Sequence, residues 1–205
     1  MSAGALPMRR PAASPDAEED ARLIAASVAG DRRAFAALYR RHLDSVYARL
    51  SRLIGPVVER DDLVQQIFLD VFRALPRFRG EATFSTFLHR IVLNVACEHL
   101  ERRQRSRGKS EPLDEEQLDA LVAQDASPEA RAHQRQELAQ VFRWLGALSP
   151  KRRVAFVLVV VDGLPLVEAA SLLEVRLGAL KQRVLEARRE LTAARALSRG
   201  EEPRR

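Results

Sequence analysis

The side chains best suited to chemistry lie near the C-terminus, on one face of a predicted helix. Apolar residues spaced four, three and four apart predict its buried face: Leu180, Val184, Ala187 and Leu191. The opposite face presents polar residues and one leucine: Lys181, Gln182, Leu185, Glu186 and Arg189. Lys and Gln side chains hydrogen-bond base edges in the major groove, and an exposed Leu contacts a thymine methyl group. Arginines flank this face and suit phosphates: Arg176, Arg183 and Arg188.

The elements that must position this face follow the plan of a helix-turn-helix. A short helix over Leu166–Leu173, a turn over 174–176 and a longer helix over Leu177–Leu191 match that plan, in which the second helix enters the major groove. Glu174 occupies the turn where many such motifs carry Gly. An ordinary helical hairpin with a solvated basic face has the same pattern, so that interpretation stays open.

Residues for catalysis or metal binding do not form a recognisable set. The four histidines are scattered along the chain: His42, His89, His99 and His133. The single Cys97 excludes a disulfide framework and a cysteine-rich zinc site. The sequence also has no Gly-rich phosphate loop and no Ser/His/Asp arrangement. We therefore expect no enzymatic activity, no metal and no cofactor.

Charge is distributed in blocks along the 205 residues. Residues 21–103 hold 14 basic and 9 acidic side chains, residues 104–140 hold 5 and 8, and residues 141–205 hold 13 and 7. The two basic blocks are either solvated helical surfaces or polyanion-binding modules separated by an acidic tether. With no apolar leader and no bilayer-length apolar run, we expect a soluble, cytoplasmic protein without membrane insertion.

Apolar spacing and helix-stop residues predict an all-α fold with two helical domains joined by a flexible linker. Asp61 is the predicted N-cap of a helix to about residue 75, and Ser85 that of the next helix. The buried face of the first of these helices is predicted to hold Leu63, Val64, Ile67, Phe68, Val71, Phe72 and Leu75. The expected divisions are a disordered tail over 1–20, a first domain over 21–103, a linker over 104–135, a second domain over 136–196 and a tail over 197–205.

Two sets of motifs carry a family resemblance. Residues 61–73, with 78–81, 84–88 and 90–94, resemble the second conserved region of extracytoplasmic-function (ECF) sigma factors, the small subunits that direct bacterial RNA polymerase to promoters. Residues 148–150 and 153–158 are similar to the fourth region of that family, and so are 162–164, 168–170, 178–183 and 187–188. The resemblance covers about residues 20–103 and 136–193, in the family's order.

The resemblance implies three binding faces and their partners. Contacts to the polymerase core are implied for Asp62, Gln65, Gln66, Leu69, Asp70 and Arg73. Contacts to the minus-ten promoter element are implied for Arg79, Phe84, His89, Arg90, Asn94, Arg102 and Arg103. Contacts to the minus-thirty-five element are implied for Arg176, Lys181, Gln182, Arg183, Leu185, Glu186, Arg188 and Arg189. The partners are then core polymerase (its clamp helices and flap), promoter DNA and, in some members, an anti-sigma factor.

Each of these binding faces also has a simpler structural interpretation. The polar face of helix 61–75 can be merely solvated, Phe78, Phe84 and Phe87 can be core residues, and His89 is expected on the surface. Ala179 and Glu186 depart from the family pattern. Glu186 is expected to repel phosphates, but its carboxylate can accept a hydrogen bond from a cytosine amine. The main alternative function is a stand-alone helix-turn-helix regulator of transcription, and a helical adaptor is a third.

Overall fold

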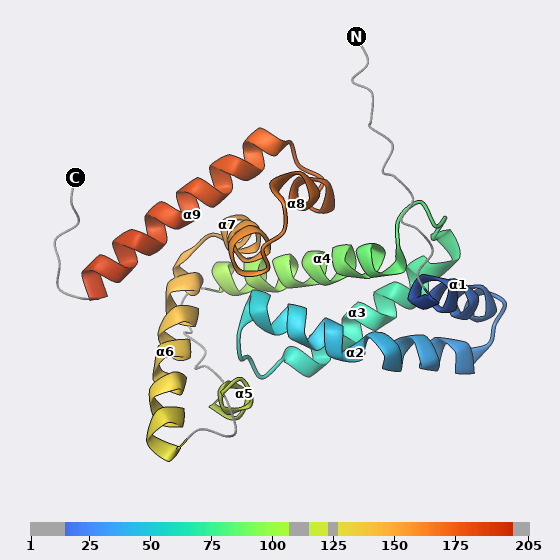
Figure 1. Cartoon of the computed structure of the whole chain (residues 1–205), viewed down its shortest axis with the longest axis horizontal. Helices are drawn as coiled ribbons and strands as arrows, with labels where there is room; N and C mark the ends of the chain where they lie inside the picture. Colours follow the sequence, from blue (N-terminus) through green and yellow to red (C-terminus); the bar gives the residue numbers. More distant parts are fainter. Residues whose placement is uncertain (1–14, 107–114, 123–126, 199–205) are drawn as a thin grey trace, which may run out of the picture.

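The computed structural model describes residues 15–106, 115–122 and 127–198, and every regular element in these ranges is a helix (Figure 1). This confirms the all-α prediction. None of the helices in these ranges is long and apolar enough to cross a bilayer.

The first helical module is built from α1 (Pro15–Val28), α2 (Arg32–Ile54), α3 (Arg60–Ala74), the 3₁₀ turn η1 (Leu75–Arg77) and α4 (Phe84–Arg105). Helices α2, α3 and α4 pack on one another, and α1 packs against α2. Their shared core contains side chains that lie on one face of each helix: Leu38, Val46 and Leu50 of α2, Ile67 and Val71 of α3, and Val92 of α4. The helical spacing of apolar residues therefore determines which faces meet.

Two predicted helix caps are wrong. Helix α3 begins at Arg60 with Glu59 at the N-cap, and Asp61 lies in its first turn, where a carboxylate favours the positive end of the helix. Helix α4 begins at Phe84, and its N-cap is Thr83, whose Oγ1 accepts a hydrogen bond from the Thr86 amide at 3.2 Å. Both helices thus start two residues earlier than predicted.

The predicted buried face of α3 is correct except at Phe72. That side chain is 52% exposed and contacts the Phe35 ring edge-on at 5.0 Å. Phe72 follows the fully buried Val71 directly, so it projects toward the rim of the core.

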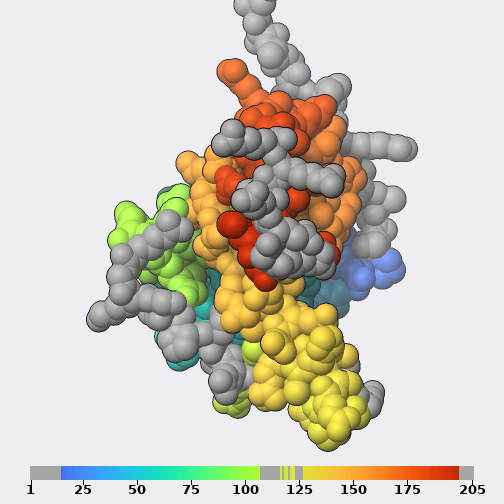
Figure 2. Space-filling model, turned by 90° about the vertical axis from the view of Figure 1, so that its left-hand side faces the viewer, coloured from blue at the N-terminus to red at the C-terminus, as the bar shows by residue number. Residues whose placement is uncertain are grey.

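The second module is built from α6 (Pro128–Ala147), α7 (Pro150–Phe156), the π-helical turn η2 (Val157–Val161), α8 (Leu166–Leu172) and α9 (Leu177–Ser198). Ser149 is the N-cap residue of α7 and Pro150 occupies its first turn, as predicted. Helices α7 and α9 pack closely, around the buried Leu158 and Leu180. Figure 2 shows the N-terminal part of α6 at one extremity of the molecule.

Several expected tail and linker residues are helical. Helix α1 starts at Pro15 rather than at residue 21, and Asp20 within it is buried, with its Oδ1 3.0 Å from Nε2 of His42. Helix α5 (Glu115–Ala120) and the first residues of α6 fall inside the range expected to be linker. They are ordered by mutual packing and by an ion pair between Arg135 and Asp119 at 3.0 Å. Residues 104–105 of the predicted linker belong to α4, and residues 197–198 of the predicted C-terminal tail belong to α9. Residues 1–14, 107–114, 123–126 and 199–205 lie outside the described residues.

The two modules pack against each other along α4, which lies between α2 and α3 on one side and α7 and α8 on the other (Figure 1). Buried side chains from both modules join in one apolar cluster, and Leu145, Leu148 and Ala187 form a second, smaller one. An ion pair joins Arg52 of α2 to Asp162 after η2 at 2.6 Å. Arg153 of α7 is only 5% exposed, and its Nε and Nη2 have no hydrogen-bond partner.

Candidate protein-binding and nucleic-acid-binding faces

The outer face of α3 carries the predicted core-binding residues together. The side chains opposite the buried Leu63, Val64 and Ile67 are exposed or, for Asp70, half-exposed: Asp62, Gln65, Gln66, Leu69, Asp70 and Arg73. Leu69 is 45% exposed, so this polar face includes an apolar centre. A mixed face of this kind is suited to docking against the helices of another protein.

Hydrogen bonds order part of this face. Gln66 Nε2 donates to Asp70 Oδ1 at 2.9 Å, and Arg73 Nη1 lies 3.4 Å from the same oxygen. These contacts span one turn of α3 and bring an amide and a cation to the same carboxylate. The face therefore presents a connected set of donors and acceptors beside Leu69.

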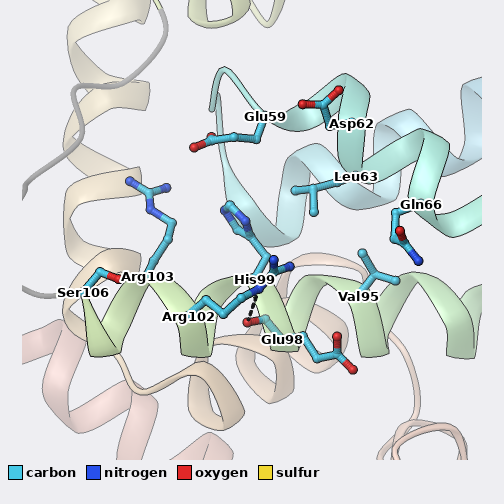
Figure 3. A pocket seen from close by; sticks show the side chains of 10 residues that line it. All are labelled: Glu59, Asp62, Leu63, Gln66, Val95, Glu98, His99, Arg102, Arg103 and Ser106. Carbon is cyan, nitrogen blue, oxygen red and sulfur yellow. Dashed lines mark hydrogen bonds between the residues drawn. The ribbon is translucent and has the colours of Figure 1, made fainter.

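A hollow of about 830 Å³ lies between the start of α3 and the second half of α4 (Figure 3). Its lining combines both charge signs with apolar and polar side chains: Glu59, Asp62, Leu63, Gln66, Val95, Glu98, His99, Arg102, Arg103 and Ser106. Residues predicted for protein binding (Asp62, Gln66) and for DNA binding (Arg102, Arg103) thus meet at one hollow.

His99 is a member of this hollow that sequence reasoning did not single out. The residue is buried and its Nε2 has no hydrogen-bond partner. Burial, reinforced by the positive charge of Arg103, lowers the pKa of His99 to about 4. The ring is therefore neutral near pH 7. No signal in the sequence distinguishes it, because its burial depends on the packing of α3 against α4.

The predicted minus-ten residues are not all on the surface. Arg79, Asn94 and Arg102 are exposed and Arg103 is half-buried. Phe84 is buried in a ring cluster with Phe78, Phe87 and His42, which agrees with the core interpretation of these phenylalanines.

His89 is buried, and the expectation that it lies on the surface is wrong. Burial, aided by the nearby guanidinium groups of Arg49 and Arg52, lowers the pKa of His89 to about 4. Its Nε2 has no hydrogen-bond partner.

Arg90 is engaged by the second module. Its Nη2 donates to the carbonyl oxygen of Ser171 at 3.3 Å, and its Nη1 lies 3.4 Å from Glu174 Oε1. In this arrangement Arg90 spans the contact between α4 and the turn after α8. This cation is thus available for DNA only where the two modules separate.

The α8–turn–α9 unit has the predicted helix-turn-helix form. Glu174 in the turn has a φ of 53°, a left-handed conformation that costs a non-Gly residue about 1 kcal/mol. The turn is closed by a hydrogen bond from the Val175 amide to the Ala170 carbonyl at 3.0 Å. Glu174 therefore adopts the left-handed conformation for which other such turns use Gly.

Helix α9 places the predicted DNA-binding residues on its outer side. Leu180, Val184 and Ala187 are buried as predicted. The predicted contact residues are exposed except Arg183 and Glu186, which are half-exposed: Arg176, Lys181, Gln182, Arg183, Leu185, Glu186, Arg188 and Arg189. The charge of this face is positive overall, as phosphate binding requires.

Glu186 is held inside a network. Arg152 of α7 donates from Nε to Glu186 Oε2 at 2.7 Å and from Nη1 to Glu190 Oε1 at 2.6 Å. Gln182 Nε2 donates to Glu186 Oε1 at 2.8 Å. These hydrogen bonds, first that of Gln182 and then that of Arg152, lower the pKa of Glu186 below its usual range. The expected repulsion of phosphates by Glu186 is therefore offset by an arginine that sequence reasoning missed.

No group of three or more His, Cys, Asp or Glu side chains gathers to hold a metal within the part of the chain that the structure describes. Cys97 is half-buried on α4, and burial raises the pKa of its thiol. It is therefore a poor nucleophile at neutral pH.

Comparisons with known families and proteins match both modules. The family described as Sigma-70 region 2 matches residues 38–106, and the family described as Sigma-70, region 4 matches residues 138–191. The ECF RNA polymerase sigma factor SigM of Mycobacterium tuberculosis is 36% identical over 174 residues, which cover 84% of this chain and 82% of the relative.

Two further proteins extend the comparison. The ECF RNA polymerase sigma factor SigE of Mycolicibacterium smegmatis is 34% identical over 154 residues, which cover 75% of this chain but only 58% of that relative. The solved structure of CnrH in complex with the cytosolic domain of CnrY is similar at 29% identity and a TM-score of 0.56, covering 85% of this chain and 96% of that chain.

Proposed function

Because the chain belongs to the family of extracytoplasmic-function RNA polymerase sigma factors, we propose that its two helical modules divide promoter recognition between them. The chain directs core polymerase to promoters and assists the start of transcription. The observation that carries the division of labour is the occurrence of the two family regions, in order, on two bodies that each present a separate binding face.

We assign core binding to the outer face of α3. Its exposed Leu69 supplies apolar contact area, and Asp62, Gln65 and Gln66 supply polar contacts that fix the register of a docked helix. The region matched to Sigma-70 region 2, residues 38–106, includes the whole of this face. The boundaries proposed for this module are residues 21–103, with α1 as an N-terminal addition from Pro15.

We assign minus-ten contacts to α4 and to the loop before it. Arg79, Asn94 and Arg102 are exposed there and offer cations for phosphates and an amide for a base. Arg90 joins them once α4 is released from the second module. The buried Phe84 and His89 support this surface by packing rather than by contact in the arrangement described here.

We assign the minus-thirty-five element to α9 within a module over residues 136–196. The exposed Lys181 and Gln182 face the groove, while Arg176 and Arg188 suit phosphates. A stand-alone regulator would need only this half of the chain. The match of residues 38–106 to a polymerase-binding family leaves that alternative unfavoured.

The partners proposed for this chain are core polymerase, through clamp helices and flap, and promoter DNA. An anti-sigma factor is a further proposed partner, supported by the similar CnrH, which was solved in complex with the cytosolic domain of CnrY. The chain acts by binding and not by catalysis, and it works in the cytoplasm, where polymerase meets DNA.

Run-off transcription with core polymerase on genomic DNA tests the proposal. The chain should give RNA from a limited set of starts, and Gln66→Ala should weaken core binding measured by titration while its thermal unfolding stays unchanged. Arg143→Ala on α6 is the matched control, because the Arg143 side chain hydrogen-bonds Gln140 in its own helix and lies on the second module. A chain that binds promoter DNA without core, and never initiates RNA synthesis with it, would be a stand-alone regulator instead.

A further inference from the structure

The Arg152–Glu186–Gln182 network connects the recognition helix α9 to α7, outside the helix-turn-helix unit. Both acidic residues that Arg152 binds, Glu186 and Glu190, lie one turn apart on α9. Arg152 Nη2 is also 2.6 Å from Glu186 Oε2, so two guanidinium nitrogens contact one carboxylate oxygen. An arginine bonded in this way fixes the carboxylate in position and orientation.

The fixed carboxylate in turn sets the orientation of the Gln182 amide. A side-chain amide has a donor end and an acceptor end, and only the donor end is attracted to a carboxylate. The reversed amide would bring its carbonyl oxygen against Glu186 Oε1, where the 2.8 Å separation makes the contact repulsive. Glu186 therefore holds the Gln182 carbonyl oxygen away from itself.

The orientation leaves a donor and an acceptor side by side at the end of Gln182. One amide hydrogen is donated to Glu186, and no residue of the described ranges hydrogen-bonds the second hydrogen or the carbonyl oxygen. Adenine presents the complementary pair in the major groove, with N7 as acceptor and the N6 amine as donor. Gln182 is exposed on the outer side of α9, beside the exposed Leu185.

We propose that Arg152 is a positioning residue and Gln182 a specificity-determining residue, so that the Arg152–Glu186 pair aligns Gln182 to select adenine at one position of the upstream promoter element. This inference rests on the proposed function of α9 as the minus-thirty-five reader. It gives Glu186 a role as a support for Gln182 rather than as a direct reader of cytosine.

The test measures base preference in holoenzyme reconstituted from core polymerase and the full chain. Templates with a randomised upstream element are transcribed, and the transcripts are sequenced to give a preference at every position. The wild-type chain should prefer adenine about tenfold at one position, as one bidentate amide–adenine pair predicts. Gln182→Ala should abolish that preference and leave the other positions unchanged.

Arg152→Ala and Glu186→Gln should relax the same position, although neither residue contacts the base. Glu190→Gln is the matched control, because it removes the second ion pair of Arg152 and keeps the contact to Glu186. It should retain the adenine preference. A purely structural role for Arg152 would instead make Glu190→Gln behave like the other variants. If Arg152→Ala fails to fold, the isosteric Glu186→Gln decides the question.

Two results would overturn the inference. One is a preference that Gln182→Ala removes and Glu186→Gln leaves intact. The other is a cytosine preference that disappears with Glu186→Gln alone, which would make Glu186 the reader. Failure of the proposed function would look different, because the wild-type holoenzyme would then produce no promoter-specific RNA from any template.

Discussion

The two buried histidines of α4 show how packing keeps an ionisable side chain neutral. His89 and His99 are nearly enclosed, and each lies among arginines. Both effects disfavour the charged imidazolium, and they lower the pKa of each residue to about 4 from an ordinary value of 6.5. Residue types alone could not predict this, because the arginines come from α2, from the end of α4 and from α7.

We predict that these histidines make the first module sensitive to mild acid. The folded pKa lies below the unfolded one, so the unfolded chain binds protons first as the pH falls. The stabilisation from the neutral rings is complete above about pH 6.5 and is lost progressively toward pH 4. The paired variant His89→Gln with His99→Gln should show a flatter dependence of the melting temperature between these pH values.

The exposed His133 on α6 supplies the control for that experiment, since its side chain is 72% exposed. His133→Gln should follow the wild-type curve. Parallel curves for the wild type and the paired variant would contradict the prediction.

Gly55 is a second residue whose role depends on tertiary contact. It ends α2 with a φ of 83°, and a Cβ added there would lie 2.8 Å from Cδ1 of Phe142 on α6. Gly163 also has a positive φ, of 69°, but open space surrounds the position of its missing Cβ.

We predict that Gly163→Ala lowers the free energy of unfolding by about 1 kcal/mol, from backbone strain alone. Gly55→Ala should cost about 1–3 kcal/mol more, because Phe142 must move. Denaturant unfolding of the two variants measures the difference. Equal losses would mean that Phe142 does not pack on Gly55 in solution.

At the scale of elements, apolar spacing predicted the helices and most of their buried faces. The intervals of three and four along α2, α3 and α9 are sufficient to predict which side chains are buried, because each helix buries a single apolar stripe. The caps of α3 and α4 were not predicted correctly. Several Ser, Thr and Asp residues precede each helix, and which of them becomes the cap depends on where packing starts the helix.

We predict that Thr83→Ala destabilises the first module by about 1 kcal/mol, because it removes the acceptor for the Thr86 amide. Ser85→Ala should cost much less, since Ser85 is an exposed residue inside the first turn of α4. Thermal or urea unfolding compares the two. A larger loss of stability for Ser85→Ala than for Thr83→Ala would show that Ser85 is the N-cap residue of α4.

At the scale of the whole molecule, the sequence predicted two modules but not their contact. The ion pairs between the modules join residues far apart in the chain, such as Arg52 and Asp162, which are separated by 110 positions. Periodicity and block charge carry no information on such pairs. The predicted binding faces on α3 and α9 remain exposed in the packed arrangement, whereas Arg90 is engaged by Ser171 and Glu174.

We predict that Asp162→Ala combined with Glu174→Ala favours separation of the modules. Each ion pair contributes at most about 1 kcal/mol, so their joint loss should raise the ratio of open to docked molecules by up to about thirtyfold. Energy transfer between dyes on α1 and α9 should fall. Glu168→Ala on α8, an exposed residue outside these pairs, should leave the transfer unchanged. An unaltered signal in the double variant would show that the apolar contact alone sets the arrangement.

The buried guanidinium of Arg153 makes an unfavourable contribution to the free energy of the docked form. Burial, with Arg103 of α4 adding to it, lowers the pKa of Arg153 to about 10, and two of its nitrogens find no acceptor. Burying a charged guanidinium without hydrogen-bond acceptors costs desolvation free energy, and that cost is removed when the group is hydrated again after the surfaces separate. The contact between α4 and α7 therefore includes one unfavourable electrostatic contribution, which disappears when the two helices separate.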